Sequence, residues 1–195
     1  LWEAGTLRFC AFATVHARAT WHLMQLAESA GFSGLVGKVN MDRNAPEALT
    51  EDTAASLAQT EELALRARSE LHNIGFIATP RFVPSTTPAL MEGLGALVEK
   101  HQLPVQSHVD ENRGEVALVR ELHPEARSYA HVYDNFGLMP TGRTVLAHAI
   151  WLTDPEVELL REKRVLVAHS PQSNANLTSG IMPARRWLSA GLSCA

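Results

Sequence analysis

The histidine His108 and the carboxylate Glu111 lie close together in the stretch that spans residues 106–112. The apolar residues up to Val105 predict a short buried strand, so His108 falls where that strand ends and Glu111 follows in the loop. An imidazole nitrogen is a good Zn²⁺ ligand, and a nearby carboxylate that does not bind the metal can move protons to and from its water. The alternative is a histidine and an acidic loop that only cap a strand.

Other polar side chains also follow predicted strands. In a (β/α)₈ barrel the chemistry gathers where the parallel strands end, whereas a packing role would scatter polar residues over both ends. The residues at these strand ends, besides the first pair, are His16, Asp42, Arg43, Arg81, His148, His169, Ser173 and Asn174. Their distribution favours one functional site at the carboxyl edge of a sheet.

Short apolar stretches alternate with amphipathic ones along the whole chain. Strands are predicted over 7–14, 34–41, 74–79, 104–107, 144–147, 165–168 and from 192 onward. Helices are predicted over 19–30, 53–71, 88–101, 115–122, 129–136, 154–163 and 183–190. Strands that are apolar throughout and separated by helices are typical of a parallel sheet. Seven such steps exceed a usual doubly wound domain, so we expect an α/β fold, a partial (β/α)₈ TIM barrel.

Two helices carry more detailed expectations. Thr87 followed by Pro88 predicts the amino-terminal cap and first turn of the helix over 88–101. For the helix over 53–71 we expect four leucines on the inner side: Leu57, Leu63, Leu65 and Leu71.

Composition restricts the class of protein. The chain has 195 residues, 46% of them apolar, which suits one domain over 1–195 with a substantial core. A net charge of −4 without a basic cluster argues against a nucleic-acid partner. No run of eighteen apolar residues and no signal peptide is visible, so we expect no membrane partner. Two cysteines, Cys10 and Cys194, suit a reducing compartment, and we expect a cytoplasmic protein.

Four stretches together resemble the guanine deaminases of the amidohydrolase superfamily. They are the loops over 37–46 and 79–82, the motif over 108–112 and the run over 168–174. The Arg43 and Arg81 loops are features of guanine deaminases, whereas the His108 and Pro171 motifs are shared with related deaminases and chlorohydrolases. The resemblance covers nearly the whole chain. It corresponds to the barrel from its second strand to the start of its eighth, incomplete at both ends and lacking the first strand.

The resemblance implies a role for each matching residue. His108 would be a zinc ligand, Glu111 the general acid/base and His148 the residue that orients the zinc-bound water. Arg81 would hold the carbonyl edge of guanine, since a planar fork of donors suits a flat heterocycle. Phe82 would pack against the ring, with ordinary core packing as the alternative. The small-molecule partner would be guanine, the cofactor Zn²⁺, and a homodimer is compatible with the family.

Each role has a structural alternative. Arg81 could form a loop salt bridge, His148 could be a buried histidine bonded to backbone, and His169 is expected to serve packing or hydrogen bonding. Ser173 and Asn174 are expected to shape the site. The remaining histidines are expected to be solvated: His22, His72, His101, His123 and His131.

The sequence also departs from the family pattern. It has no His-x-His pair and no eighth-strand aspartate, which supply further zinc ligands in the family, and Asp110 stands where a serine is common. Catalytic zinc needs at least three protein ligands. We therefore expect hydrolytic deamination of guanine to xanthine and ammonia in a longer chain. The alternatives are another deaminase or chlorohydrolase of the superfamily, or a non-catalytic fragment.

Overall fold

The computed structural model describes residues 3, 5, 6 and 8–195. All strand pairs within these residues are parallel. The first sheet has the order β1 (Arg8–Phe12), β2 (Ser33–Gly37), β4 (Ile74–Phe76). The second pairs β3 (Val39–Asn40) with β5 (Thr79–Pro80). The third has the order β6 (Val105–Val109), β7 (Thr144–His148), β8 (Leu166–Ala168), β9 (Ser193–Cys194).

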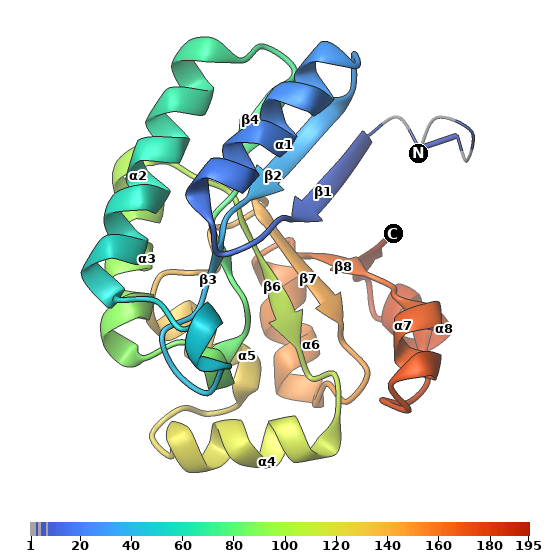
Figure 1. Cartoon of the computed structure of the whole chain (residues 1–195). Coiled ribbons are helices and arrows are strands. Elements are labelled where there is room, and N and C mark those ends of the chain that lie inside the picture. Colours follow the sequence, from blue (N-terminus) through green and yellow to red (C-terminus); the bar gives the residue numbers. More distant parts are fainter. Residues whose placement is uncertain (1–2, 4, 7) are drawn as a thin grey trace.

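The three sheets adjoin one another. Only Lys38 separates β2 from β3, only Ile77 and Ala78 separate β4 from β5, and a parallel bridge joins Ala78 to Val105. If β2 with β3 and β4 with β5 are each counted as one interrupted strand, the described chain has seven strand lines in sequence order, as predicted. Figure 1 shows the arrows of β2, β6 and β7 pointing the same way, so their carboxyl ends share one side of the molecule.

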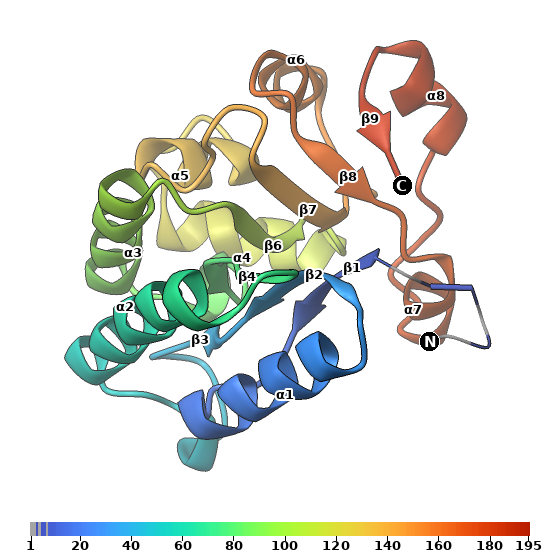
Figure 2. The ribbon, with the colours of Figure 1, turned by 90° about the horizontal axis from the view of Figure 1, so that it is seen from above.

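Helices connect the strands. They are α1 (Ala17–Ser29), α2 (Thr53–Glu70), α3 (Pro88–His101), α4 (Arg113–Leu122), α5 (Tyr129–Asn135), α6 (Asp154–Glu162), α7 (Pro171–Asn176) and α8 (Ala184–Ser189), with 3₁₀ turns η2 (Glu47–Leu49) and η3 (Val83–Ser85). Seen from above, α1, α2, α3 and α6 lie around the outside of the strands (Figure 2). The predicted cap of α3 is confirmed, because the Thr87 side chain accepts a hydrogen bond from the Leu90 amide.

The predicted inner face of α2 is partly wrong. Leu63 is buried, but Leu65 is 47% exposed. Residues two apart on a helix point in nearly opposite directions, so both leucines could not face the sheet. The buried positions of α2 are instead mostly small or hydroxylic: Ser56, Thr60, Leu63, Ala64 and Ala67.

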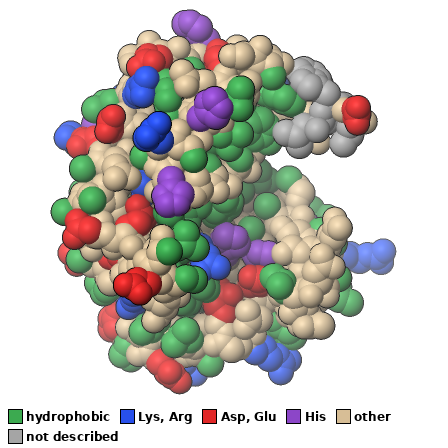
Figure 3. Space-filling model, in the orientation of Figure 1, with side chains coloured by type: hydrophobic (Ala, Val, Ile, Leu, Met, Phe, Trp, Pro, Cys, Tyr) green, Lys and Arg blue, Asp and Glu red, His purple; other side chains and the backbone are tan. Residues whose placement is uncertain are grey.

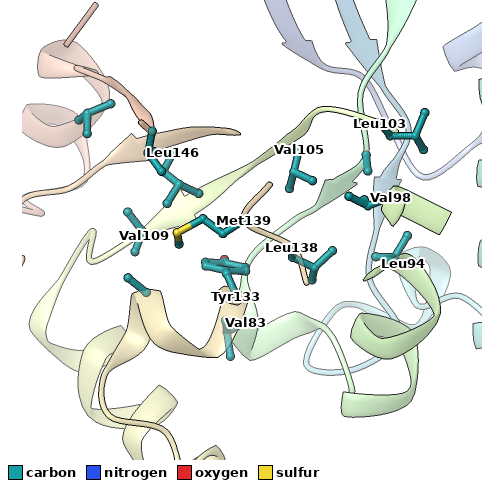
Figure 4. Close-up of a cluster of buried hydrophobic side chains, with 14 of the residues drawn as sticks. Val83, Leu94, Val98, Leu103, Val105, Val109, Tyr133, Leu138, Met139 and Leu146 are labelled. Atoms are coloured by element: carbon teal, nitrogen blue, oxygen red, sulfur yellow. The ribbon is translucent and has the colours of Figure 1, made fainter. Parts of the chain in front are cut away.

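The strand that carries His108 lies within the hydrophobic core. Val105 and Val109 of β6 are fully buried, together with Leu146 of β7 and Tyr133 of α5. Figure 4 shows these side chains in one cluster between the strands and the helices. The Gln106 side chain also donates to the Ala11 carbonyl at 2.9 Å, which links β6 to the end of β1. This packing restricts the strand that positions the site.

Within the described residues, no helix combines the length and hydropathy that a bilayer span requires.

Candidate active site

His108 and His148 come together at the carboxyl ends of neighbouring strands. In the parallel register of β6 and β7, His108 pairs with Ala147 and Val109 with His148. The two imidazole rings lie nearly parallel, with their centroids 5.3 Å apart and an interplanar angle of 21°. Two histidines that are 40 positions apart in the sequence thus share one site. Figure 3 shows histidine, basic and acidic side chains gathered in a hollow of this face.

The ring nitrogens of His108 have different surroundings. Nδ1 lies 2.6 Å from the Arg81 carbonyl oxygen, which can only accept, so Nδ1 carries the hydrogen and Nε2 keeps its lone pair. Burial lowers the pKa of His108, while the hydrogen bond to the Arg81 carbonyl and the charge of Glu111 oppose the change only in part, so the net shift is downward. A neutral imidazole that donates one nitrogen to a carbonyl and leaves the other free is what a zinc ligand requires.

The backbone of His108 is also held in place. Its carbonyl oxygen accepts a hydrogen bond of 2.8 Å from the Tyr133 hydroxyl, whose pKa is raised by burial, so the phenol stays a neutral donor. The preceding Ser107 hydroxyl donates to the Pro80 carbonyl at 2.7 Å. These bonds connect the end of β6 with α5 and β5.

His148 adopts a backbone conformation that is rare for a residue with a side chain. Its φ is +75°, and that of Ala149 is +48°. Such left-handed conformations typically cost on the order of 1 kcal/mol or more and persist where surrounding contacts hold them. The Ala149 amide donates to the Val109 carbonyl, and two further amides of the same turn, those of Ile150 and Trp151, donate to the Asp110 carbonyl. Backbone hydrogen bonds therefore connect the turn after β6 to the turn after β7.

The side chain of His148 lies between an amide and a carboxylate. Its Nδ1 is 2.7 Å from Asn174 Oδ1, and its Nε2 is 3.7 Å from Glu111 Oε2. The imidazole is nearly fully buried, and Nδ1 is bonded to a side chain rather than to backbone as the structural alternative required. Because the amide oxygen accepts from Nδ1, Nε2 is directed toward Glu111.

Glu111 has a second partner from a distant part of the chain. The Ser179 hydroxyl donates to Glu111 Oε1 at 2.9 Å, while Oε2 faces His148. Sequence reasoning missed Ser179 altogether. It lies 68 residues after Glu111, in a loop without a recognisable motif, so no local pattern could have indicated the contact.

Arg81 reaches the same region, whereas Phe82 lies beside it. Arg81 and His108 both line a hollow of about 500 Å³, and Phe82 is not among its lining residues. The Arg81 guanidinium instead lies over the Phe82 ring, 4.9 Å from its centroid. Within the described residues Arg81 forms no ion pair, so the salt-bridge alternative finds no support there.

The walls of this hollow are mainly apolar. They come from the ends of β1 and β3 and from η2: Phe12, Val15, Val39, Met41 and Leu49. Phe12 packs against His108 with ring centroids 4.6 Å apart and an angle of 44°. The aromatic ring beside the histidine is therefore Phe12, which the sequence analysis did not single out. A hollow with apolar walls and one guanidinium suits a flat, polar-edged ring.

Asp42 and Arg43 have structural partners. Asp42 accepts hydrogen bonds from the Thr87 amide, the Thr87 hydroxyl and the Thr53 hydroxyl. Arg43 donates to the carbonyls of Val83 and Pro84. Together they connect the loop after β3 with the loop that follows Arg81.

Two predictions on histidines have different outcomes. His123 was expected to be solvated and is instead 3% exposed, with its ring edge against Phe136 and Nδ1 3.2 Å from a Glu125 oxygen. His123 is the residue that caps the end of α4, and its burial depends on contacts that a local pattern does not reveal. His16 is exposed, and it lines a surface groove along α1 rather than the hollow.

The described residues fit part of a zinc site. They contain no group of three or more His, Cys, Asp or Glu side chains that could hold a metal ion together. His108 has the free nitrogen, the neutral charge state and the carbonyl anchor of a ligand, while His148 and Glu111 stand beside it.

The comparisons with known proteins agree with this geometry. The model of the Amidohydrolase family matches residues 1–195. The probable guanine deaminase of Schizosaccharomyces pombe is 41% identical over 194 residues, which cover 96% of this chain and 36% of that protein. A crystal structure of guanine deaminase from C. acetobutylicum with bound guanine superimposes with a TM-score of 0.97 at 43% identity, covering 100% of this chain and 46% of that one.

A more distant structure extends the similarity. An adenosine deaminase from Xanthomonas campestris with bound zinc has a TM-score of 0.86 at 26% identity, covering 100% of this chain and 42% of that one. The chain spans under half the length of each of these three relatives. The predicted resemblance is confirmed, and the chain belongs to the amidohydrolase family, with guanine deaminases among the relatives that match it along this segment.

Proposed function

We propose that this chain is part of a zinc-dependent hydrolase that deaminates guanine to xanthine and ammonia. One observation carries the proposal: Glu111 lies against His148 beside the hollow that His108 and Arg81 line. A proton-transfer group, a metal-ligand candidate and a substrate-binding cation thus converge at one place. The bound guanine in the C. acetobutylicum relative supports the choice of substrate.

His108 is the residue of this segment that would bind Zn²⁺, through its free Nε2. When bound, Zn²⁺ would supply a hydrolytic water acidic enough to lose a proton near neutral pH. We propose that the other ligands come from parts of the whole protein outside this segment. The seven strand lines would then be part of a (β/α)₈ barrel, in one catalytic domain.

Glu111 would move the protons. It takes a proton from the water while the water oxygen adds to the amino-bearing carbon of guanine, and it then delivers that proton to the purine. The remaining proton of the added hydroxyl then passes through Glu111 to the amino nitrogen, the carbon–nitrogen bond breaks as ammonia leaves, and xanthine remains. His148, held through Nδ1 by Asn174, orients the water with Nε2.

Arg81 would recognise the carbonyl edge of the ring. Its guanidinium offers several coplanar donors, whereas a lysine offers a point charge. Phe82 would contribute by supporting the guanidinium, which lies over its ring. Phe12 and the other apolar walls would contact the faces of the purine.

A substrate panel tests the proposal. The whole protein, loaded with Zn²⁺, should release ammonia from guanine and far more slowly from adenine, cytosine or a chlorotriazine. Removal of the metal with a chelator should stop the release, and added Zn²⁺ should restore it. Preference for another ring would favour a different deaminase or chlorohydrolase, and no turnover of any substrate would favour a non-catalytic role.

A further inference from the structure

The segment from α7 to the loop before α8 contacts both partners of the proposed proton transfer. Asn174 and Ser179 are 1% and 5% exposed, and their side chains bond His148 and Glu111 at 2.7 and 2.9 Å. Neither histidine nor carboxylate belongs to this segment. One stretch of six residues, 174–179, therefore contacts both a side chain at the end of β7 and a side chain in the loop after β6.

The contact with Ser179 makes the two oxygens of Glu111 unequal. Oε1 accepts from the Ser179 hydroxyl, and Oε2 faces His148 Nε2 at 3.7 Å. A glutamate side chain has several rotatable bonds, and two contacts on opposite oxygens restrict the plane of its carboxylate. The bond from Ser179 directs Oε1 away from His148, so Oε2 is the oxygen placed to receive a proton on the His148 side.

Ser179 is itself held by contacts around its backbone. Its amide donates to the Asn174 carbonyl at 2.9 Å, and its carbonyl accepts from the Trp151 indole at 3.0 Å. The next residue, Gly180, has a φ of +131°, and a Cβ there would meet Ile150 at 3.0 Å and Trp151 at 3.1 Å. The close approach to the turn after β7 fixes the hydroxyl relative to His148.

We propose that Ser179 is a positioning residue for Glu111, holding Oε1 so that Oε2 performs the proton transfer. The inference deepens the proposed function and rests on it. The hydroxyl does not react, and its effect acts through the orientation of the carboxylate. Asn174 has the corresponding place beside His148, so the two bonds keep the carboxylate and the imidazole in register.

The test replaces Ser179 in the whole, zinc-loaded protein. In S179A, kcat for guanine should fall about 10- to 100-fold, the range expected for loss of a hydrogen bond to a charged group. KM and zinc content should change by less than about threefold, since neither guanine nor metal contacts Ser179 in the proposal. S179T keeps the hydroxyl and should recover kcat to within about threefold of wild type.

A matched control and a spectroscopic readout separate positioning from folding. S29A removes a hydroxyl that makes one hydrogen bond, to the Gln25 carbonyl at the end of α1, and should leave kcat unchanged. The infrared carboxylate band of Glu111, obtained as the difference from E111Q, should shift in S179A without any substrate. If S179A does not fold, kcat is compared between S179C and S179T instead. S179C is expected to have the lower kcat of the two.

Three outcomes would overturn the inference. They are a kcat of S179A within twofold of wild type, an unshifted carboxylate band, or a loss that S179T does not recover. A wild-type protein that turns over no guanine would instead contradict the proposed function, while a shifted band in that protein would still support the contact between Ser179 and Glu111.

Discussion

Two buried polar clusters of this molecule differ in how completely their hydrogen-bonding atoms are used. Around Lys38, which is fully buried, the ammonium donates to the Glu51 carboxylate, the Ser56 hydroxyl and the Val39 carbonyl. Around His108 and His148, each ring has a partner at Nδ1, while Nε2 of His108 has no hydrogen bond within the described part of the chain. One cluster uses every donor of its cation, and the other keeps a nitrogen free at a hollow.

This difference distinguishes a cluster that stabilises the fold from a cluster that can take part in a reaction. Burial lowers the pKa of Lys38, while the hydrogen bond and the charge of Glu51 oppose this change. Glu51 also accepts from the Met41 amide, so the pair holds the loop after β3. A polar group whose hydrogen bonds are complete can only position its neighbours. A polar group with an unused atom beside a hollow can bind or react.

The largest effect is expected at the cluster beside the hollow. E111Q should lower kcat for guanine by about 10² to 10⁴, because an amide cannot carry the proton. Zinc content and the urea midpoint of unfolding should stay near those of wild type, as measured by metal analysis and circular dichroism. A variant within tenfold of wild type would remove Glu111 from the proposed role.

The converse is expected at the Lys38 cluster. K38M should lower the free energy of unfolding by about 3 to 5 kcal/mol, because it leaves the Glu51 carboxylate without its buried partner. Activity per folded molecule should change little. K100M, which removes an exposed lysine paired with Glu61, is the control and should leave the urea midpoint unchanged. Equal midpoints in both variants would contradict the contrast between the clusters.

Glu115 sharpens the comparison, because it is buried and incompletely bonded but does not line the hollow. Burial raises its pKa from 4.5 to about 7, and one of its oxygens has no partner within the described residues. Between these two values the folded chain binds a proton that the unfolded chain has lost, so stability falls as pH rises.

The measurement compares wild type with E115Q between pH 4.5 and 8. The stability of wild type relative to E115Q should fall with pH by on the order of 3 kcal/mol, with most of the change below pH 7. The kcat of E115Q should remain within a few-fold of wild type. A difference in stability that does not depend on pH would show that Glu115 is ionised in the folded protein.

The smallest effect is expected at Arg81. R81K should raise KM for guanine about tenfold, since the planar fork is replaced by a point charge, with zinc content unchanged. The Arg81 carbonyl would still anchor His108, because that bond uses the backbone. Unchanged saturation kinetics would remove Arg81, and much of the case for guanine over other rings, from the proposal.

The sequence by itself determined the features that depend on local pattern. The order of the strands and of the helices other than α7, the Thr87 cap and the placement of His108 and His148 at strand ends follow from apolar periodicity and from residues adjacent in the chain. The short helix α7 was not predicted. The resemblance carried by the 108–112 motif also depends on adjacent residues, and it identified the family.

Only the tertiary structure decided which distant groups meet. Phe12 against His108, Asn174 against His148 and Ser179 against Glu111 join residues 96, 26 and 68 positions apart. The left-handed turn at His148 and the burial of His123 depend likewise on what packs around them. A residue's type and neighbours set its local preference, but the partners of a side chain depend on how the strands and loops come together in three dimensions.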